Sequence, residues 1–448
     1  MKQQETTKKE GKLKRNLTLL EGTAYAVSFL IGTGIFLKPA SVLLNTGSTG
    51  MALTFWVLGG VISLFSALTI AEIASYIPKL GGLYTYISEI YNDVLGYIYG
   101  WVVIIVSSPG GSAASAIAFA TFATNFIDLS DVGVKILALG IIWFMAITQI
   151  ISTKGSMRLQ TVGTFAKLIP IFIIVILGII KGGSGTVNFS AVGGNASAGY
   201  GVALLGVLWA YDGWIATCNL GSEIIKPEKN LPKAIIMAIL FVIGVYSVFN
   251  YVIFKLVPAD QIVSSKSIGI DVAQILLGPV GASFITLGML VSSAITLNAQ
   301  VMNGTRTYLA MANRKQIIGS NFISHINPKF DTPVNALLVM CTVSSIYIIS
   351  GTFNSITNLV VFVVWIFFVL ATVGIFRLRK KFPRNENLYH VPLYPIVPIL
   401  GIVGGLYLLY STMTSSLTTT LLGSGAALIG IPMYYYTKKK YGSSETKE

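Results

Sequence analysis

The chain has 448 residues, of which 54% are hydrophobic and only 11% are charged, and its mean hydropathy is +0.74. These values exclude a soluble globular protein, because charge-free stretches such as 94–127 and 182–211 each exceed the ~20 residues that span a bilayer. With two cysteines, two histidines and no nucleotide-binding or zinc-protease motif, the sequence offers little for a disulfide framework, a metal centre or a cofactor.

Twelve apolar runs bounded by polar turns follow one another along the chain, and each predicts a membrane helix. We therefore expect an all-α polytopic membrane protein with 12 transmembrane helices. In chain order, the predicted helices cover 18–44, 51–76, 94–126, 132–152, 159–180, 198–220, 233–256, 270–311, 333–350, 356–376, 394–412 and 417–436.

The net charge of +14 indicates topology rather than nucleic-acid binding. Most of the 31 Lys and Arg residues fall in alternate connections, which become cytoplasmic when the N-terminus is placed inside. Short cytoplasmic connections of membrane proteins are enriched in Lys and Arg, so both termini are expected in the cytoplasm. The expected location is the plasma membrane.

The first predicted helix is interrupted at mid-membrane depth by Gly32-Thr33-Gly34, which follows Leu30 and Ile31. Lipid cannot satisfy backbone groups, so such a break is tolerated only where it faces protein or a polar cavity. The N–H groups near Thr33 and Gly34 suit a carboxylate, and the carbonyls near Leu30 suit an ammonium. An alternative interpretation is a glycine pair for tight helix packing.

The sixth predicted helix has a similar interruption at Asp212-Gly213, within the run from Trp209 through Ala210 and Tyr211 to Trp214. Freed carbonyls from Trp209 to Asp212 would complete an ammonium site, and the flanking aromatic rings would close over a solute. Alternatively, these rings only pack and Asp212 belongs to a short loop, although a carboxylate within a span is costly without a partner or water.

Two broken helices in corresponding positions of two halves are typical of a secondary transporter, whose substrate lies at the breaks. The pattern predicts five helices repeated with inverted topology (5+5), with discontinuous helices 1 and 6, followed by two more helices. The expected divisions are a cytoplasmic tail (1–17), the first repeat (18–180), the second repeat (198–376), helices 11 and 12 (394–436) and a second cytoplasmic tail (437–448).

Lys167 is the third candidate site residue, because it lies about eight residues, or ~12 Å, into the fifth predicted helix. At that depth its amine is expected to face the bundle and to occupy the place of a coupling cation, bridging helix 1 carbonyls to a hydroxyl such as that of Ser292. The alternative is a shallower lysine that reaches the interface. Glu72, Glu223 and Arg306 are candidates for a cytoplasmic charge network or for ordinary interfacial charges.

At these residues the chain resembles the L-amino-acid transporter (LAT) family of the amino acid–polyamine–organocation (APC) superfamily, and the resemblance covers nearly the whole chain. It is similar in particular to bacterial exchangers of small neutral amino acids such as serine, threonine, alanine and cysteine. The motifs that carry the resemblance are 31–36, 71–86, 210–214, 226–235 with Glu223, and 391–395.

The resemblance implies sodium-independent exchange with the substrate carboxylate on the N–H groups of Thr33 and Gly34. Animal members pair with a heavy subunit through a cysteine between helices 3 and 4; this chain has none there, so no disulfide-linked heavy subunit is expected. No cofactor is expected either. Trp209 takes the position of the aromatic gate, and its size argues for small side chains. The resemblance also places Lys167 at the former sodium site beside Ser292. It assigns the ammonium to the carbonyls of Leu30, Trp209, Ala210 and Asp212.

Three other functions compete with exchange. A proton-coupled amino acid symporter of the same fold stays open, since a lysine that loses its proton during the cycle would carry protons. A channel or receptor needs no backbone cage at the membrane midplane, and a membrane enzyme would need a nucleophile and a base, which the sequence does not place together.

Overall fold

The computed structural model describes residues 17–77, 82–151, 160, 163, 165–183, 185–190, 199–222, 224–330 and 332–441. Within these ranges the regular structure is helical, apart from two isolated bridges, which confirms the all-α class. The first half contains α1 (Leu19–Leu30), α2 (Gly34–Thr46), α3 (Thr49–Tyr76), α4 (Gly82–Ile90), α5 (Asp93–Val102), the π-helix η1 (Val103–Ser107), α6 (Ser108–Ala123), α7 (Asp131–Ile151) and α9 (Ile169–Lys181).

The second half of the chain is also helical. Its elements are α10 (Tyr200–Ala210), the 3₁₀-helix η3 (Trp214–Ser222), α11 (Pro227–Leu256), α12 (Ala259–Ser264), α13 (Ile268–Asn313), α14 (Ser320–Ile323), α15 (Val334–Ser350), α16 (Phe353–Lys381), α17 (Ile396–Ser415) and α18 (Leu417–Tyr441).

Eight helical segments among the described residues are long and apolar enough to cross a membrane, with α5, η1 and α6 counted as one, and the bent pair of α1 and α2 makes a ninth. The shorter apolar helices α9, α10 and α15 lie within three further predicted segments. Side-chain caps fix several helix starts: Thr18 forms a capping box with Glu21 on α1, and Thr352 accepts the Ser355 N–H on α16. The count of twelve spans and the inverted repeat stay predictions.

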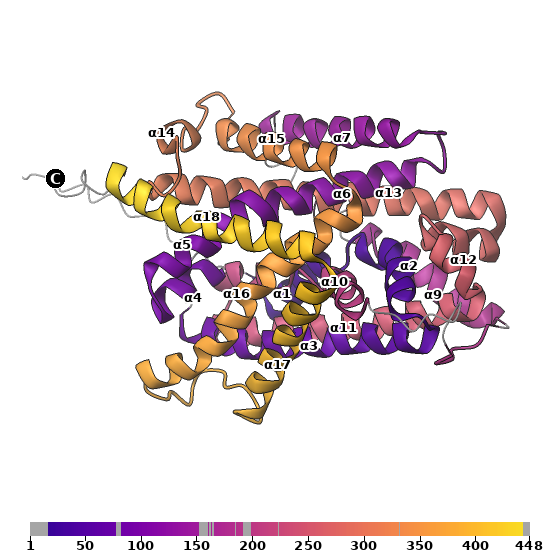
Figure 1. The fold of residues 1–448 in the computed structure, drawn as a ribbon, viewed down its shortest axis with the longest axis horizontal. Coiled ribbons are helices and arrows are strands. Elements are labelled where there is room, and N and C mark those ends of the chain that lie inside the picture. The colour runs from indigo at the N-terminus through magenta and orange to yellow at the C-terminus, as the bar shows by residue number, and fades with distance from the viewer. Residues whose placement is uncertain are drawn as a thin grey trace, which may run out of the picture.

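The interrupted helices α1 and α10 lie in the middle of the molecule (Figure 1). Long helices surround them: α3 packs on α11, α13 packs on α6, and α16 packs on α17. Large apolar side chains on α18, including Leu421, Leu422 and Ile429, are exposed, as expected where a helix faces lipid. The two breaks are thus enclosed by other helices.

Two predicted helices differ in detail from the structure. The eighth, expected over 270–311, is α13, which bends near its beginning at Gly278 (φ 70°), directly before Pro279. Proline removes a backbone donor and interrupts the helical ladder there. The sixth continues after its break as the 3₁₀-helix η3 instead of an α-helix.

Candidate substrate site

The first break separates α1 from α2 by three non-helical residues and bends the span by 48°. The Ile31 N–H still bonds the Val27 carbonyl at 2.9 Å, so α1 ends in an ordinary last turn. Within the part of the chain that the structure describes, neither the Thr33 nor the Gly34 N–H donates to a backbone carbonyl. Both lie at the positive end of α2, which is the arrangement that binds an anion.

The second break ends α10 at Ala210 and continues through a turn over 211–213 before η3 begins. Gly213 has φ +115°, a backbone conformation that glycine adopts without the steric penalty of a side chain. The Asp212 N–H donates to the Trp209 carbonyl at 3.2 Å. The interruption is therefore built into the backbone of the turn.

The two breaks lie in direct contact with each other. A Cβ added to Gly34 would lie 2.9 Å from both Cα and Cβ of Ala210 and 3.1 Å from Cδ1 of Trp209. A Cβ added to Gly213 would lie 2.8 Å from the carbonyl oxygen of Phe29, on α1. Only glycine allows this approach at both positions, so the structure brings together the segments in which the sequence placed the substrate site.

Tyr246 of α11 connects the two breaks and was missed by the sequence analysis. Its hydroxyl lies 2.9 Å from the Leu30 carbonyl oxygen and 3.2 Å from that of Ala210, and the side chain is fully buried. The single hydroxyl proton serves one acceptor at a time, so the two carbonyls share it. The sequence signal that could have identified Tyr246 is its phenol group within an apolar span, because a buried phenol needs a hydrogen-bond partner.

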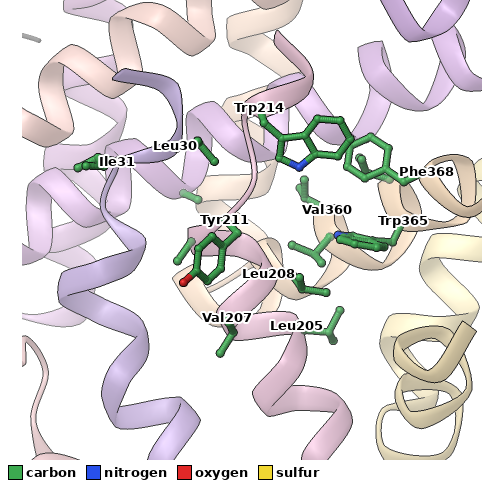
Figure 2. Close-up of a cluster of buried hydrophobic side chains, with 14 of the residues drawn as sticks. Leu30, Ile31, Leu205, Val207, Leu208, Tyr211, Trp214, Val360, Trp365 and Phe368 are labelled. Atoms are coloured by element: carbon green, nitrogen blue, oxygen red, sulfur yellow. The ribbon is translucent and has the colours of Figure 1, made fainter. Parts of the chain in front are cut away.

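The aromatic residues of the second break have separate surroundings. Tyr211 packs on Trp56 and Tyr246, with ring centroids 6.4 and 5.2 Å away, and Trp214 packs on Phe368 at 5.2 Å. Figure 2 shows the Trp214 ring beside that of Phe368, and the Tyr211 ring apart from both. The Tyr211 and Trp214 rings therefore pack against the scaffold, and a role of Tyr211 in substrate binding stays a prediction.

Trp209 has a different environment from these two rings. It is half-buried, and its ring meets the ring of Phe353, the first residue of α16, edge to face at 6.3 Å. Together with its contact at the Gly34 position, this places Trp209 between the first break and α16, where an aromatic gate would lie.

Lys167 lies in a turn directly before α9 and is 1% exposed, which excludes the interpretation as a lysine that reaches the interface. Its Nζ donates to the Ser28 carbonyl, two residues before α1 ends. Ser292 on α13 is also buried, but its hydroxyl has no hydrogen-bond partner among the described residues. The predicted link to helix 1 is present, whereas the second half of the bridge, a bond to Ser292, is not formed in this conformation.

Glu72 forms a charge network with a partner that the sequence analysis did not name. Its carboxylate accepts two bonds from Arg379 of α16, both 2.8 Å, and one from the Val391 N–H at 2.7 Å. Glu223 lies outside the described residues. The network joins α3 to the basic end of α16.

A surface pocket of about 500 Å³ lies between residues 185–190 and 254–259. None of its lining residues belongs to either break. It is therefore separate from the candidate site.

Two discontinuous helices that meet inside a bundle of apolar spans are typical of a membrane transporter. Comparison with known proteins agrees with this assignment to the membrane transporters. A model of the family described as "Amino acid permease" matches residues 17–435. The chain belongs to this amino acid permease family, within the APC superfamily, and is a multi-pass membrane protein that transports amino acids rather than an enzyme.

Several relatives cover nearly the whole chain. The serine/threonine exchanger SteT of Bacillus subtilis (strain 168) is 36% identical over 433 residues, which cover 96% of this chain and 98% of that protein. The human cystine/glutamate transporter is 31% identical over 432 residues, covering 94% and 85% of the two chains. The human b(0,+)-type amino acid transporter 1 is 29% identical over 433 residues, covering 95% and 88%.

Proposed function

We propose that the protein is a sodium-independent exchanger of small neutral L-amino acids that works by alternating access. The observation that carries the proposal is the contact between the two breaks: Gly34 meets Ala210 at the end of α10, and neither Thr33 nor Gly34 donates to a backbone carbonyl among the described residues. The most similar of the relatives described above is named as a serine/threonine exchanger, which favours small hydroxyl-bearing substrates.

The substrate carboxylate would bind the Thr33 and Gly34 N–H groups at the start of α2. The ammonium would meet the carbonyls of Leu30, Trp209, Ala210 and Asp212. Two of these carbonyls share the hydroxyl of Tyr246, and one accepts a backbone N–H. A carbonyl oxygen accepts two bonds, so an ammonium with three donors either joins or replaces these partners.

The Trp209 ring would lie over the bound amino acid and limit the size of its side chain. Ile31, fully buried at the first break, also restricts the space. Serine, threonine and alanine are therefore expected to be transported better than leucine or phenylalanine.

Lys167 would act as a fixed cation in place of sodium. Its ammonium holds the last turn of α1 by donating to the Ser28 carbonyl, so no bound ion is needed to connect that helix to the scaffold. The same buried amine keeps a second candidate function open, a proton-coupled symporter, if it loses its proton during the cycle.

The proposed topology places the protein in the plasma membrane with cytoplasmic termini and twelve spans in a 5+5 inverted repeat. The basic last turns of α16 and α18 would both face the cytoplasm. The proposal includes no cofactor. It also includes no disulfide-linked heavy subunit, because Cys218 and Cys341 are both buried.

The test is uptake of radiolabelled serine into proteoliposomes that are empty or preloaded with unlabelled serine. An exchanger accumulates label only in preloaded vesicles, with or without a sodium gradient. If an inward proton gradient drives accumulation in empty vesicles, the symporter is correct. If sodium does so, the fixed-cation role of Lys167 is wrong.

A further inference from the structure

Lys38 is a second buried lysine, and it lies within the first predicted helix. It belongs to α2, four residues or ~6 Å along the axis after Gly34, and its side chain is 0% exposed. Its Nζ donates to Thr357 Oγ1 at 2.6 Å, to Asn354 Oδ1 at 2.9 Å and to Asn358 Oδ1 at 3.5 Å. All three acceptors are in the first two turns of α16.

The partners of Lys38 are neutral. Among the described residues no carboxylate forms an ion pair with it, so its charge is balanced only by amide and hydroxyl oxygens and by the ring of Phe353, 5.2 Å away. A buried ammonium is tolerated only while such acceptors surround it. If α16 moved away, water would solvate the same ammonium, so the contact has two satisfied states, one closed and one hydrated.

The contact also includes the gate described above. Phe353, which lies under the Lys38 ammonium, packs edge to face on Trp209 at 6.3 Å. The Lys38 stem passes α10, with Cδ 3.5 Å from the Cβ position of Gly206. Lys38 therefore joins α2, α10 and α16 beside the breaks, at the end of α16 opposite to its basic last turn.

We propose that Lys38 is a positioning residue for transport: its bonds to Asn354, Thr357 and Asn358 close the outer side of the site by holding the Phe353–Trp209 pair over the breaks. The assignment of this side as outer rests on the proposed topology. In the closed state the amino acid is covered, and release of the contact exposes the breaks to the outside.

The test measures access to the breaks and not transport, so it is independent of which amino acid is carried. Ile31→Cys introduces a thiol at the first break, where Ile31 is fully buried, and both native cysteines are buried. Intact cells that express this protein are treated with a membrane-impermeant thiol reagent. Adding Lys38→Met, which keeps the stem and removes the charge, is expected to speed modification about tenfold or more.

Thr357→Val is the second variant, because it removes the shortest bond of Lys38 while keeping the shape of the acceptor side chain. It is expected to speed modification less than Lys38→Met, and it keeps the test valid if that variant fails to fold. Lys38→Arg retains hydrogen-bond donors, so its rate of thiol modification should stay closer to that of the parent protein.

The matched control is Lys135→Met, which removes a lysine near the start of α7, at the outer side in the proposed topology. The Lys135 ammonium is exposed and bonds only the Ile349 carbonyl among described partners, so the modification rate should not change. Equal rates in the parent, Lys38→Met and Thr357→Val proteins overturn the proposal. If the protein with Ile31 intact fails to exchange serine but the modification rates differ as expected, the proposed function is wrong and the closing role of Lys38 stands.

Discussion

Gly34→Ala tests whether contact between the two breaks is required for transport. The added methyl group would lie 2.9 Å from Cα and Cβ of Ala210, whereas carbon atoms in favourable contact are about 3.5–4.0 Å apart. One of the two partners is backbone, so relief requires α2 and α10 to separate by at least about 0.5 Å. Such overpacking costs about 1–3 kcal/mol, and at 1.4 kcal/mol per factor of ten this is a roughly 5–150-fold loss.

The loss is expected in the rate of serine exchange into preloaded proteoliposomes, with the protein still inserted in the membrane. Gly244→Ala is the matched control: this glycine is also in a membrane helix, but an added Cβ would meet nothing within 4 Å. Exchange by Gly34→Ala within twofold of the parent rate, at an unchanged melting temperature, would refute the argument that the breaks must touch.

Trp209→Ala is expected to admit larger amino acids such as leucine, since the gate ring then leaves space; an unchanged substrate profile in competition assays would assign Trp209 to packing. Tyr246→Phe should bind serine up to about tenfold more tightly in equilibrium binding and exchange it more slowly, because the ammonium no longer competes with a hydroxyl for the two break carbonyls. Weaker binding would contradict this. Lys167→Met should abolish most exchange at normal expression, because the Ser28 carbonyl loses its donor; near-normal exchange would remove its role as a cation surrogate. Glu72→Ala should lower the free energy of unfolding by about 1–3 kcal/mol, seen as a lower melting temperature, since the Val391 N–H and the partly exposed Arg379 lose their acceptor. Arg384→Gln, which breaks an exposed ion pair, should change it by less than about 1 kcal/mol.

The sequence was sufficient to locate the breaks because the cost of interrupting a membrane helix is local. Gly32-Thr33-Gly34 and Asp212-Gly213 stand out in apolar runs, and the structure places the interruptions at 31–33 and 211–213. The burial of Lys167 followed from the same reasoning, since a charge at that depth must face the protein interior.

The partners across the molecule were not predictable in this way. Tyr246 meets Leu30 across 216 residues, and Lys38 meets Thr357 across 319. A sequence shows that a buried phenol or ammonium needs an acceptor, but the identity of the acceptor depends on how distant helices pack. For the same reason Glu72 was correctly singled out, while its partner Arg379 was not.

Lys167 and Lys38 hold the two halves of the broken first span to different parts of the protein. Lys167 connects the end of α1 to the segment before α9, whereas Lys38 connects α2 to the beginning of α16. A continuous helix would transmit any movement of one half to the other. A span divided at Gly32 and Thr33 need not do so. Under the proposed function, the break would both bind an amino acid and let each half respond to a different contact. Under the proposed exchange mechanism, release of the Lys38 contact opens one side while Lys167 still holds the other half, which is the asymmetry that alternating access requires.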